Sequence, residues 1–407
     1  MEGMQASSIG HKGSVATVIA SFLHFDMSFT IWVLLGSLGI FITKDLRLSP
    51  AQQGLMVAIP VLSGSLLRVP MGLLSDRFGG KRIGVSILLF LFLPLLLGWL
   101  VRVNLPIILC IGLMLGVAGA SFAVALPLAS RWYPLEKQGL VLGICAAGNM
   151  GTVIANLFAP TLAKTYGWHN VLAFTMIPLA FVLLAFLLLA KDSPSQPKGE
   201  PVSRYLAAMK YGDLWWFCLF YAVTFGGFVG LSTFLPLFLR GQYAMNPIAA
   251  GLLTALAAFM GSTLRPLGGY LADKFGGALT LSLLLGCIGI FYAVSSFLPA
   301  LSVMAVVLVV GMACLGMGNG AVFQLVPQRF RIEIGVATGV VGAIGGLGGF
   351  FLPTFLGSVK QVSGSFGAGL FTLALFAIAA LVILRLLVAL QNGWRIAWMA
   401  QVASEVK

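Results

Sequence analysis

The chain has 407 residues, of which 59% are hydrophobic and 9% are charged, and its mean hydropathy is +1.04. Soluble globular proteins contain far more charge than this, so the composition excludes a soluble domain and indicates an integral membrane protein. The formal net charge of +13 raises the question of a nucleic-acid partner. The distribution of the basic residues, described below, argues against one.

Twelve apolar runs follow one another along the chain, and each is long enough to cross about 30 Å of hydrocarbon. Because lipid offers no hydrogen bonds to the backbone, each run must satisfy its own polar groups, so we expect helices rather than strands. The expected spans cover residues 15–42, 52–74, 83–101, 106–129, 139–163, 170–190, 214–239, 247–271, 278–298, 301–326, 335–358 and 365–390. The sequence thus predicts an all-α integral membrane protein with twelve transmembrane helices.

The Lys and Arg residues between these runs are distributed unevenly. If the N-terminus is cytoplasmic, sixteen of them fall on the cytoplasmic side and six on the other side. This bias follows the positive-inside rule, so we expect both termini in the cytoplasm and the protein in the cytoplasmic membrane. The positive charge is then a topology signal, and we expect no nucleic-acid partner.

A polar stretch with three prolines, residues 191–213, divides the twelve runs into two sets of six. We expect a cytoplasmic linker here, between an N-terminal six-helix bundle (1–190) and a C-terminal one (214–407). Residues 50–80 align without gaps to residues 247–277, with fourteen of 31 positions identical. Two pseudo-symmetric halves in parallel repeat are typical of the major facilitator fold, whose substrate site lies near the midplane between the halves.

The segment GLLSDRFGGKR, residues 72–82, resembles the loop motif that this superfamily carries between its second and third helices. In the superfamily the acidic residue of the motif helps to latch the cytoplasmic gate, so the resemblance implies this role for Asp76. The basic residues of the segment also suit a simpler role as positive-inside anchors, and the two roles are compatible. The residues that we expect in the gate are Asp76, Arg77, Asp273, Glu136 and Glu333.

Two arginines lie inside the apolar runs at equivalent positions of the repeat, Arg68 in one half and Arg265 in the other. An arginine at the centre of a membrane helix costs about 2.5–3.5 kcal/mol on insertion scales. Neither arginine has a carboxylate within one turn of its own helix. A purely structural role is the alternative. Because a guanidinium group presents a planar fork of donors that matches an oxyanion, the pair indicates an anion site between the halves.

Glycines recur four residues apart in the run 335–358, as at Gly342 and Gly346. A glycine in a helix interior costs about 1 kcal/mol relative to alanine, but small residues at this spacing let membrane helices approach closely. Close packing alone is one explanation. The other is that the bare faces at Gly148, Gly345 and Gly346 line the substrate cavity and slide during gating.

Six separate motifs, in order over the full chain, resemble those of the nitrate/nitrite porter family of the major facilitator superfamily. The most specific are GNMG at 148–151 and GAIGGLGGFFLP at 342–353. The others are FDMSFTIWVLLG (25–36), GASFAVALP (119–127), FYAVTFGGFVG (220–230) and GMGNGAVFQLVP (316–327). The resemblance implies a secondary active transporter of nitrate and nitrite by alternating access. We expect a monomer in the lipid bilayer, no enzymatic activity, no cofactor and no metal.

The resemblance also implies roles for individual residues. Arg68 and Arg265 would clamp the anion, and Asn149 and Tyr221 would donate hydrogen bonds to it. Aromatic rings would sandwich its flat faces, and the candidates are Phe29, Phe122 and Phe225.

Nitrate that enters a cell moves its charge against the membrane potential, at a cost of about 2.3 kcal/mol per 100 mV. Uptake therefore needs co-transport with protons or exchange for an outgoing anion such as nitrite. Asp26 lies inside the first apolar run, where an ionisable group is a functional candidate, with a structural hydrogen-bonded acid as the alternative. His24 is expected to have a packing role. We predict nitrate/proton symport through Asp26, with nitrate/nitrite antiport as the alternative.

Two other classes compete with this prediction. An organic-anion or drug exporter of the same fold would need a larger cavity lined by bulky residues, where this chain has glycines. The second class is a membrane-embedded enzyme or a nitrate sensor without transport. An enzyme would need a metal-ligand cluster, a phosphate loop or a nucleophile with its base, and the sequence shows no such motif. A sensor would need a polar domain to pass on its signal, and we expect none.

Overall fold

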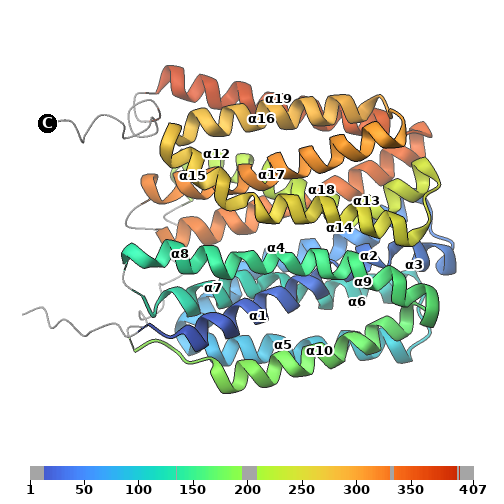
Figure 1. The fold of residues 1–407 in the computed structure, drawn as a ribbon, viewed down its shortest axis with the longest axis horizontal. Coiled ribbons are helices and arrows are strands. Elements are labelled where there is room, and N and C mark those ends of the chain that lie inside the picture. The colour runs from blue at the N-terminus through green and yellow to red at the C-terminus, as the bar shows by residue number, and fades with distance from the viewer. Residues whose placement is uncertain (1–12, 134, 195–208, 331–333, 392–393, 395–407) are drawn as a thin grey trace, which may run out of the picture.

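The structure, a computed structural model, describes residues 13–133, 135–194, 209–330, 334–391 and 394. Every regular element in these ranges is a helix, and twelve helical stretches are long and apolar enough to cross a membrane. Figure 1 shows the helices side by side along the long axis of the molecule. The prediction of an all-α protein with twelve transmembrane helices is therefore confirmed.

The N-terminal half forms the lower part of Figure 1. Its helices are α1 (Val15–Trp32), α2 (Leu34–Ser37), α3 (Gly39–Leu46), α4 (Pro50–Phe78), α5 (Gly80–Leu100), α6 (Leu105–Leu115), η1 (Gly116–Ser121), α7 (Phe122–Ser130), α8 (Leu135–Ala146), η2 (Ala147–Met150), α9 (Gly151–Tyr166) and α10 (Trp168–Leu189). The first expected span is not one helix, because ψ rises to 0° at Val33 and to −4° at Leu38. These two residues separate α1, α2 and α3.

The C-terminal half forms the upper part of Figure 1. Its helices are α12 (Gly212–Tyr221), η3 (Ala222–Gly226), α13 (Gly227–Tyr243), α14 (Pro247–Thr263), α15 (Arg265–Phe275), α16 (Gly277–Ser296), α17 (Leu301–Arg329), α18 (Ile334–Ser363) and α19 (Gly367–Leu390). Several begin with a side-chain cap followed by proline. Asn246, for example, accepts a hydrogen bond from the backbone of Ala249, and Pro247 is the first residue of α14.

The internal repeat is visible in the backbone conformation. Gly79, with φ 98° and ψ 137°, joins α4 to α5, and Gly276, with φ 99° and ψ 132°, joins α15 to α16. Glycine adopts positive φ angles without the steric cost that other residues meet. The two halves therefore make the same turn at equivalent positions, and the turn explains why both positions are glycine.

Four spans are irregular near their middles. The segments η1 and η2 are 3-10 turns, η3 is a π turn, and α14 is separated from α15 by a break at Leu264, where ψ is −3°. Such turns within membrane helices often mark functional sites. Each irregularity contains or adjoins residues expected at the site. Phe122 follows η1, Gly148 and Asn149 lie in η2, Phe225 lies in η3 directly after Tyr221, and Arg265 follows Leu264.

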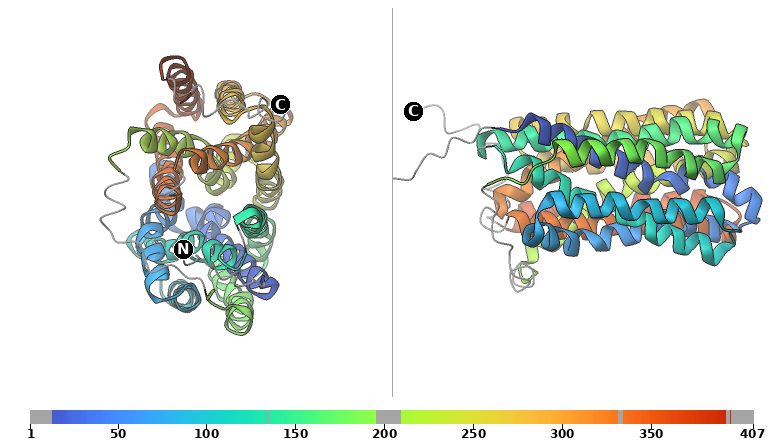
Figure 2. Two further views of the ribbon diagram at one scale, coloured as in Figure 1. Left: turned by 90° about the vertical axis from the view of Figure 1, so that its left-hand side faces the viewer. Right: turned by 90° about the horizontal axis from the view of Figure 1, so that it is seen from below.

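The start of α1 and the end of α19 lie at the same end of the bundle, on the left of Figure 1. The end of α10 and the start of α12, which flank the expected linker, lie at this end too (Figure 2), so we call it the linker end and the opposite end the far end. Figure 2 (left), viewed from the linker end, shows the N-terminal half below the C-terminal half. The two halves meet mainly where α4 packs on α18 and α9 packs on α14.

At the far end the two halves pack backbone against backbone. Gly36 lies directly against the backbone of Thr233, and Gly54 lies directly against the backbone of Pro353. Gly251 of α14 makes the same kind of contact with α9. A side chain at any of these glycines would collide with the opposite half. The halves are therefore closed on each other at the far end in this conformation.

Burial separates the helices that face lipid from those that line the centre. In the most apolar window of each span, the buried share is 28% for α10 and 28% for α19, but 89% for the span Gly212–Tyr243. Figure 1 accordingly shows α10 and α19 at opposite edges of the bundle. The span that carries Tyr221 and Phe225 is thus the most enclosed of the three.

Candidate substrate site

The side chain of Arg68 in α4 is 1% exposed. Its Nε donates a hydrogen bond to the carbonyl oxygen of Gly119 in η1 (3.2 Å), and its Nη1 donates one to the carbonyl oxygen of Gly342 in α18 (2.6 Å). Its Nη2 is buried and has no hydrogen-bond partner among the described residues. The guanidinium group thus bridges the two halves and keeps one nitrogen free for a further acceptor.

Three aromatic rings surround this guanidinium group. Its Cζ lies 5.3 Å from the ring centre of Trp32, 5.1 Å from that of Phe122 and 5.0 Å from that of Phe225. Cation–π contacts contribute about 0.5–2 kcal/mol each and offset part of the cost of removing the charge from water. Because the rings lie over the guanidinium group, its edge is the direction from which an anion can reach the N–H groups.

Phe29 occupies a different place from the other two aromatic candidates. It is 1% exposed and makes edge-on contacts with Phe25 and Trp32, with ring centres 4.9 Å and 5.1 Å apart. The indole Nε1 of Trp32 donates a hydrogen bond to the carbonyl oxygen of Pro60 (2.7 Å), which fixes the ring beside Arg68. The structure therefore places Trp32 against the guanidinium group of Arg68 and Phe29 against Trp32.

The C-terminal half contributes Tyr221, at the end of α12. Its ring stacks on Phe225 with parallel planes and centres 4.8 Å apart, and Phe323 of α17 meets it edge-on, also at 4.8 Å. The Cζ of Arg265 lies 5.7 Å from the Phe323 ring centre. Arg265 lies close enough to act electrostatically on the Tyr221 hydroxyl, but no hydrogen bond of normal geometry joins them.

Arg68 and Arg265 repel each other across this group of residues. The Nη1 of Arg265 and the hydroxyl of Tyr221 are buried, and neither has a hydrogen-bond partner in the part of the chain that the structure describes. Buried donors without partners carry a desolvation penalty. A small anion between the two arginines would relieve their repulsion and accept from the free donors.

Helix α18 approaches the site through its glycines. Gly345 lies directly against the ring of Tyr221, and Gly346 lies directly against the side chain of Ser65. A Cβ atom on Gly346 would also lie 3.5 Å from Nη1 of Arg68. Side chains at these positions would displace the residues that form the site. The glycines thus allow α18 to approach the residues of the candidate site closely.

The matching helix of the N-terminal half contributes Gly148 and Asn149 through η2. Gly148 packs against the ring of Phe25 and the backbone of Asp26, so its neighbours in this conformation belong to α1. Asn149 is 2% exposed, and its Oδ1 has no hydrogen-bond partner among the described residues. The side-chain amide of Asn149 therefore has unused hydrogen-bonding capacity beside α1.

The two ionisable side chains of α1 have different surroundings. His24 is fully buried, and its Nε2 donates to the carbonyl oxygen of Gly84 (3.1 Å), which leaves Nδ1 to accept from the hydroxyl of Ser121 (2.7 Å). These bonds agree with the packing role expected for His24. Asp26 is partly exposed, and its Oδ1 is buried without a hydrogen-bond partner among the residues described. Asp26 thus keeps a carboxylate oxygen that can take up a proton.

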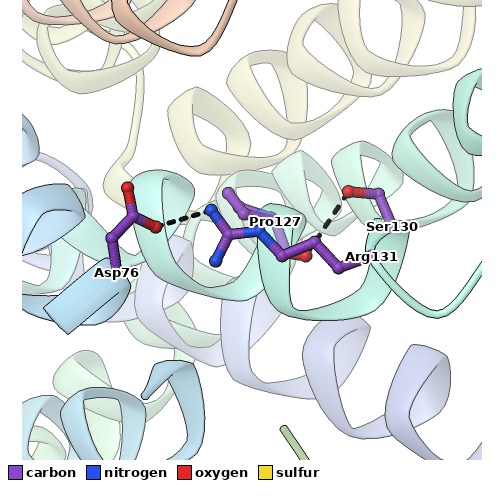
Figure 3. A network of polar contacts seen from close by, with 4 residues as sticks. All are labelled: Asp76, Pro127, Ser130 and Arg131. Carbon is purple, nitrogen blue, oxygen red and sulfur yellow. Dashed lines mark hydrogen bonds and ion pairs between the residues drawn. The ribbon is translucent and has the colours of Figure 1, made fainter. Parts of the chain in front are cut away.

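An ion pair at the linker end joins the second and fourth spans. Asp76, near the end of α4, accepts a hydrogen bond from Nη2 of Arg131, which follows α7, at 2.5 Å (Figure 3). The side chains of Arg131 and Asp76 are 22% and 16% exposed. Ser130 donates to the carbonyl oxygen of Pro127 in the same last turn of α7 (3.4 Å). Arg131 was not among the residues expected from the sequence.

The other expected gate residues occupy different positions. Arg77 is exposed at the end of α4. Asp273 of α15 accepts a hydrogen bond from Nε2 of Gln324 in α17 (2.8 Å), so this bond lies within the C-terminal half, as the Asp76 pair lies within the N-terminal half. The side chain of Glu136 and the whole of Glu333 lie outside the described residues.

Sequence reasoning missed three neighbours of the site: Trp32, Phe323 and the carbonyl group of Gly342. Trp32 and Phe323 belong to two of the motifs quoted above, so the motifs contained the signal. The motifs do not reveal which of several rings on a helix faces the arginine. A backbone carbonyl leaves no signal in the sequence at all.

Comparisons with known proteins support the fold. A family model described as Major Facilitator Superfamily matches residues 20–353. A solved structure of the nucleoside transporter NupG has a TM-score of 0.73 at 13% identity, covering 91% of this chain and 99% of that one. A bacterial homologue of the human lysosomal transporter Spinster, inward-facing and unoccupied, has a TM-score of 0.68 at 20% identity, covering 94% and 96%. Identities this low show the fold alone.

Curated relatives are more similar in sequence. A nitrite extrusion protein of Bacillus subtilis is 36% identical over 356 residues, which cover 87% of this chain and 90% of the relative. A "Probable nitrate transporter NarT" of Staphylococcus epidermidis is 34% identical, covering 91% and 96%. A "Probable nitrate/nitrite antiporter NarK1" of Thermus thermophilus is 31% identical, covering 84% and 85%. The chain therefore belongs to the nitrate/nitrite porter family of the Major Facilitator Superfamily.

Proposed function

We propose that the protein is a secondary active transporter that carries nitrate, and nitrite as well, across the cytoplasmic membrane by alternating access. The names of the relatives support these substrates. The single observation that carries the proposal is the pair Arg68 and Arg265. These residues occupy equivalent positions in the two halves, each has a free buried nitrogen, and both act on the Tyr221 hydroxyl.

The chemistry of the free groups favours a planar monovalent oxyanion. Guanidinium and hydroxyl donors suit oxygen acceptors, and two positive charges in a low-dielectric site disfavour any cation. The rings of Phe122 and Phe225 cover the guanidinium group of Arg68 and leave its edge. A flat anion that lies between the rings can therefore accept from that edge. The side-chain Nδ2 of Asn149 in η2 is the donor that the family resemblance implies for this site.

The contacts of α18 favour a small substrate over an organic anion or a drug. Gly345 lies directly against Tyr221, and Gly346 lies directly against Ser65 beside Arg68. These contacts bring the backbone of α18 to within van der Waals distance of the side chains of Tyr221 and Ser65. An exporter of bulky anions needs space at this position that the chain fills with its own helix.

A counterflow experiment tests the proposed substrate. Purified protein in liposomes loaded with unlabelled nitrate should accumulate labelled nitrate transiently, and internal nitrite should replace internal nitrate. Chlorate, which is monovalent but pyramidal, serves as a competitor, and sulfate serves as the divalent control. Liposomes that exchange none of these monovalent anions above the protein-free level would contradict the proposal.

For the driving force, the proposal is symport of nitrate with protons, and the residue concerned is Asp26. Its Oδ1 is buried without a partner in the described residues, whereas both ring nitrogens of His24 are hydrogen-bonded. A proton carried with nitrate neutralises the charge that would otherwise move against the membrane potential. Nitrate/nitrite exchange is the alternative, and it needs no titrating group.

The proposed transport cycle moves two halves against each other. Residues 1–190 and 214–407 would move as units joined by a cytoplasmic linker at 191–213, in a monomer with both termini in the cytoplasm. The far end is closed in this conformation, so the substrate would enter or leave at the linker end. Charged residues near that end would form the gate, namely Asp76, Arg77, Asp273, Glu136 and Glu333.

A further inference from the structure

The hydroxyl of Ser65 is buried where α4 meets α18. Ser65 is 0% exposed, and its Oγ has no hydrogen-bond partner among the described residues. A hydroxyl inside a helix commonly donates to the carbonyl four residues earlier, as Thr254 and Ser282 do here. Ser65 carries the cost of burial without that bond. An acceptor that is not part of the chain would remove this cost.

The position of Ser65 relative to Arg68 makes a shared acceptor possible. The two residues are three apart in α4, so they lie on the same face, one turn from each other. Gly346 of α18 lies opposite both: a Cβ atom there would touch Ser65 Oγ and lie 3.5 Å from Arg68 Nη1. The Nη2 of the same guanidinium group is free. The Ser65 hydroxyl and the guanidinium group of Arg68 therefore lie against the same glycine of α18, and each keeps an unpartnered donor among the described residues.

The C-terminal half contains the equivalent pair. Ser262 precedes Arg265 by three residues, as Ser65 precedes Arg68. Ser262 is 7% exposed, and its Oγ also lacks a partner in the described part of the chain. Each half therefore has a serine three residues before its arginine, and each of these serines has a buried hydroxyl without a partner among the described residues. Of the two serines, Ser65 is the one known to lie near its arginine, because Gly346 approaches both Ser65 and Arg68.

We propose that Ser65 is a further substrate-binding residue, whose hydroxyl donates to one oxygen of the anion while Nη2 of Arg68 donates to another. The proposal rests on the proposed transport of nitrate and nitrite. Nitrate offers three oxygens in one plane, and nitrite offers two. A donor in addition to Arg68, Arg265 and Tyr221 therefore adds a hydrogen bond to nitrate that nitrite lacks the oxygen to accept. Ser65 thereby favours the binding of nitrate over that of nitrite.

The test is a comparison of Ser65→Ala with wild-type protein in liposomes. KM is measured for nitrate and for nitrite, together with the thermal shift that each anion causes in the purified protein. We expect the KM for nitrate to rise about tenfold, the usual effect of losing one hydrogen bond to a charged partner. The KM for nitrite should change much less, so the ratio of the two constants changes. The thermal shift by nitrate should shrink in parallel.

Ser295→Ala is the matched control. Ser295 in α16 is 1% exposed and its hydroxyl also lacks a partner among the described residues, but it lies at the far end. This variant should keep the wild-type KM ratio. An unchanged ratio in Ser65→Ala, with wild-type protein that transports nitrate, would overturn the role of Ser65 and leave the proposed function standing. Wild-type protein that transports neither anion would overturn both proposals.

Discussion

Arg68 of the N-terminal half donates a hydrogen bond of 2.6 Å to the carbonyl oxygen of Gly342 in the C-terminal half. The neighbouring nitrogen of the same guanidinium group is the free donor to which we assign the substrate. One side chain therefore takes part both in the contact between the halves and in the proposed binding of the anion. In the proposed cycle, substrate binding and the relative position of the halves depend on the same group.

The first prediction concerns the shape of this group. Arg68→Lys keeps the charge but removes the planar fork, the bond to Gly119 and the stacking with three rings. We expect nitrate affinity to fall about 100-fold, because at least two charge-assisted hydrogen bonds lose their geometry. Equilibrium binding to purified protein measures the change. Arg102→Lys, at an exposed position to which we assign no role, is the control and should bind as wild type does. Wild-type affinity in Arg68→Lys would refute the clamp.

A second prediction concerns the glycine face of α18. In Gly345→Ala the added methyl group meets the ring of Tyr221, so the ring must move away from the site. We expect transport of nitrate to fall at least about tenfold while the protein remains folded, since overpacking of this kind typically costs 1–3 kcal/mol. Initial rates in liposomes and the melting temperature of the purified protein measure both effects. Gly143→Ala is the control, because a side chain there meets nothing within 4 Å. Equal rates in the two variants would show that the contact has no role in transport.

Asp26 provides the third prediction. In liposomes, an inward proton gradient should drive accumulation of nitrate by wild-type protein, so the rate should rise as the outside pH is lowered. Asp26→Asn keeps the size of the side chain but does not release or bind a proton. It should lose the response to the gradient and retain exchange of nitrate for nitrite.

Asp45→Asn is the control for this experiment. Asp45 is an exposed acid in α3 that accepts a hydrogen bond from Trp168 Nε1 (3.1 Å), and asparagine preserves the acceptor. The variant should respond to the proton gradient as wild type does. Wild-type accumulation that ignores the gradient but requires internal nitrite would replace symport by antiport.

The ion pair between Asp76 and Arg131 gives a fourth prediction. Partly exposed ion pairs contribute about 0–1 kcal/mol to stability, so Asp76→Asn should leave the melting temperature nearly unchanged. The transport rate should fall nonetheless, because the pair joins α4 to the end of α7 at the proposed gate. The double variant Asp76→Arg with Arg131→Asp should recover part of the rate. If the single variant transports at the wild-type rate, the pair has no role in gating.

The fold could be predicted from the sequence because lipid imposes a simple rule on it. Long apolar runs must be helices, and the repeat of residues 50–80 at 247–277 shows two related halves. The breaks at Val33 and Leu38 could not be predicted, because the run stays apolar across them. They arise where α2 packs against the backbone of Thr233 through Gly36, a contact with a distant part of the chain.

The candidate site was predictable only in part. Arg68 and Arg265 stand out because a charge inside an apolar run is costly and both halves repeat it. Tyr221 and Phe225 were suggested by the family resemblance. The choice between Phe29 and Trp32 depends on the rotation of α1 against α4, and composition does not report that rotation. The same holds for the hydroxyl of Ser65, which looks like an ordinary small helix residue until α18 is placed opposite it.

The closed far end consists of backbone packed on backbone, as at Gly36 with Thr233 and Gly54 with Pro353. Dispersion attraction between such surfaces falls steeply once they separate by half an ångström to an ångström. No long side chain has to leave a pocket at these glycines for the surfaces to part. Water that enters the gap can donate hydrogen bonds to the peptide carbonyl groups that line it. A closure of this kind therefore loses about a quarter to a half of its contact attraction within the first ångström of separation.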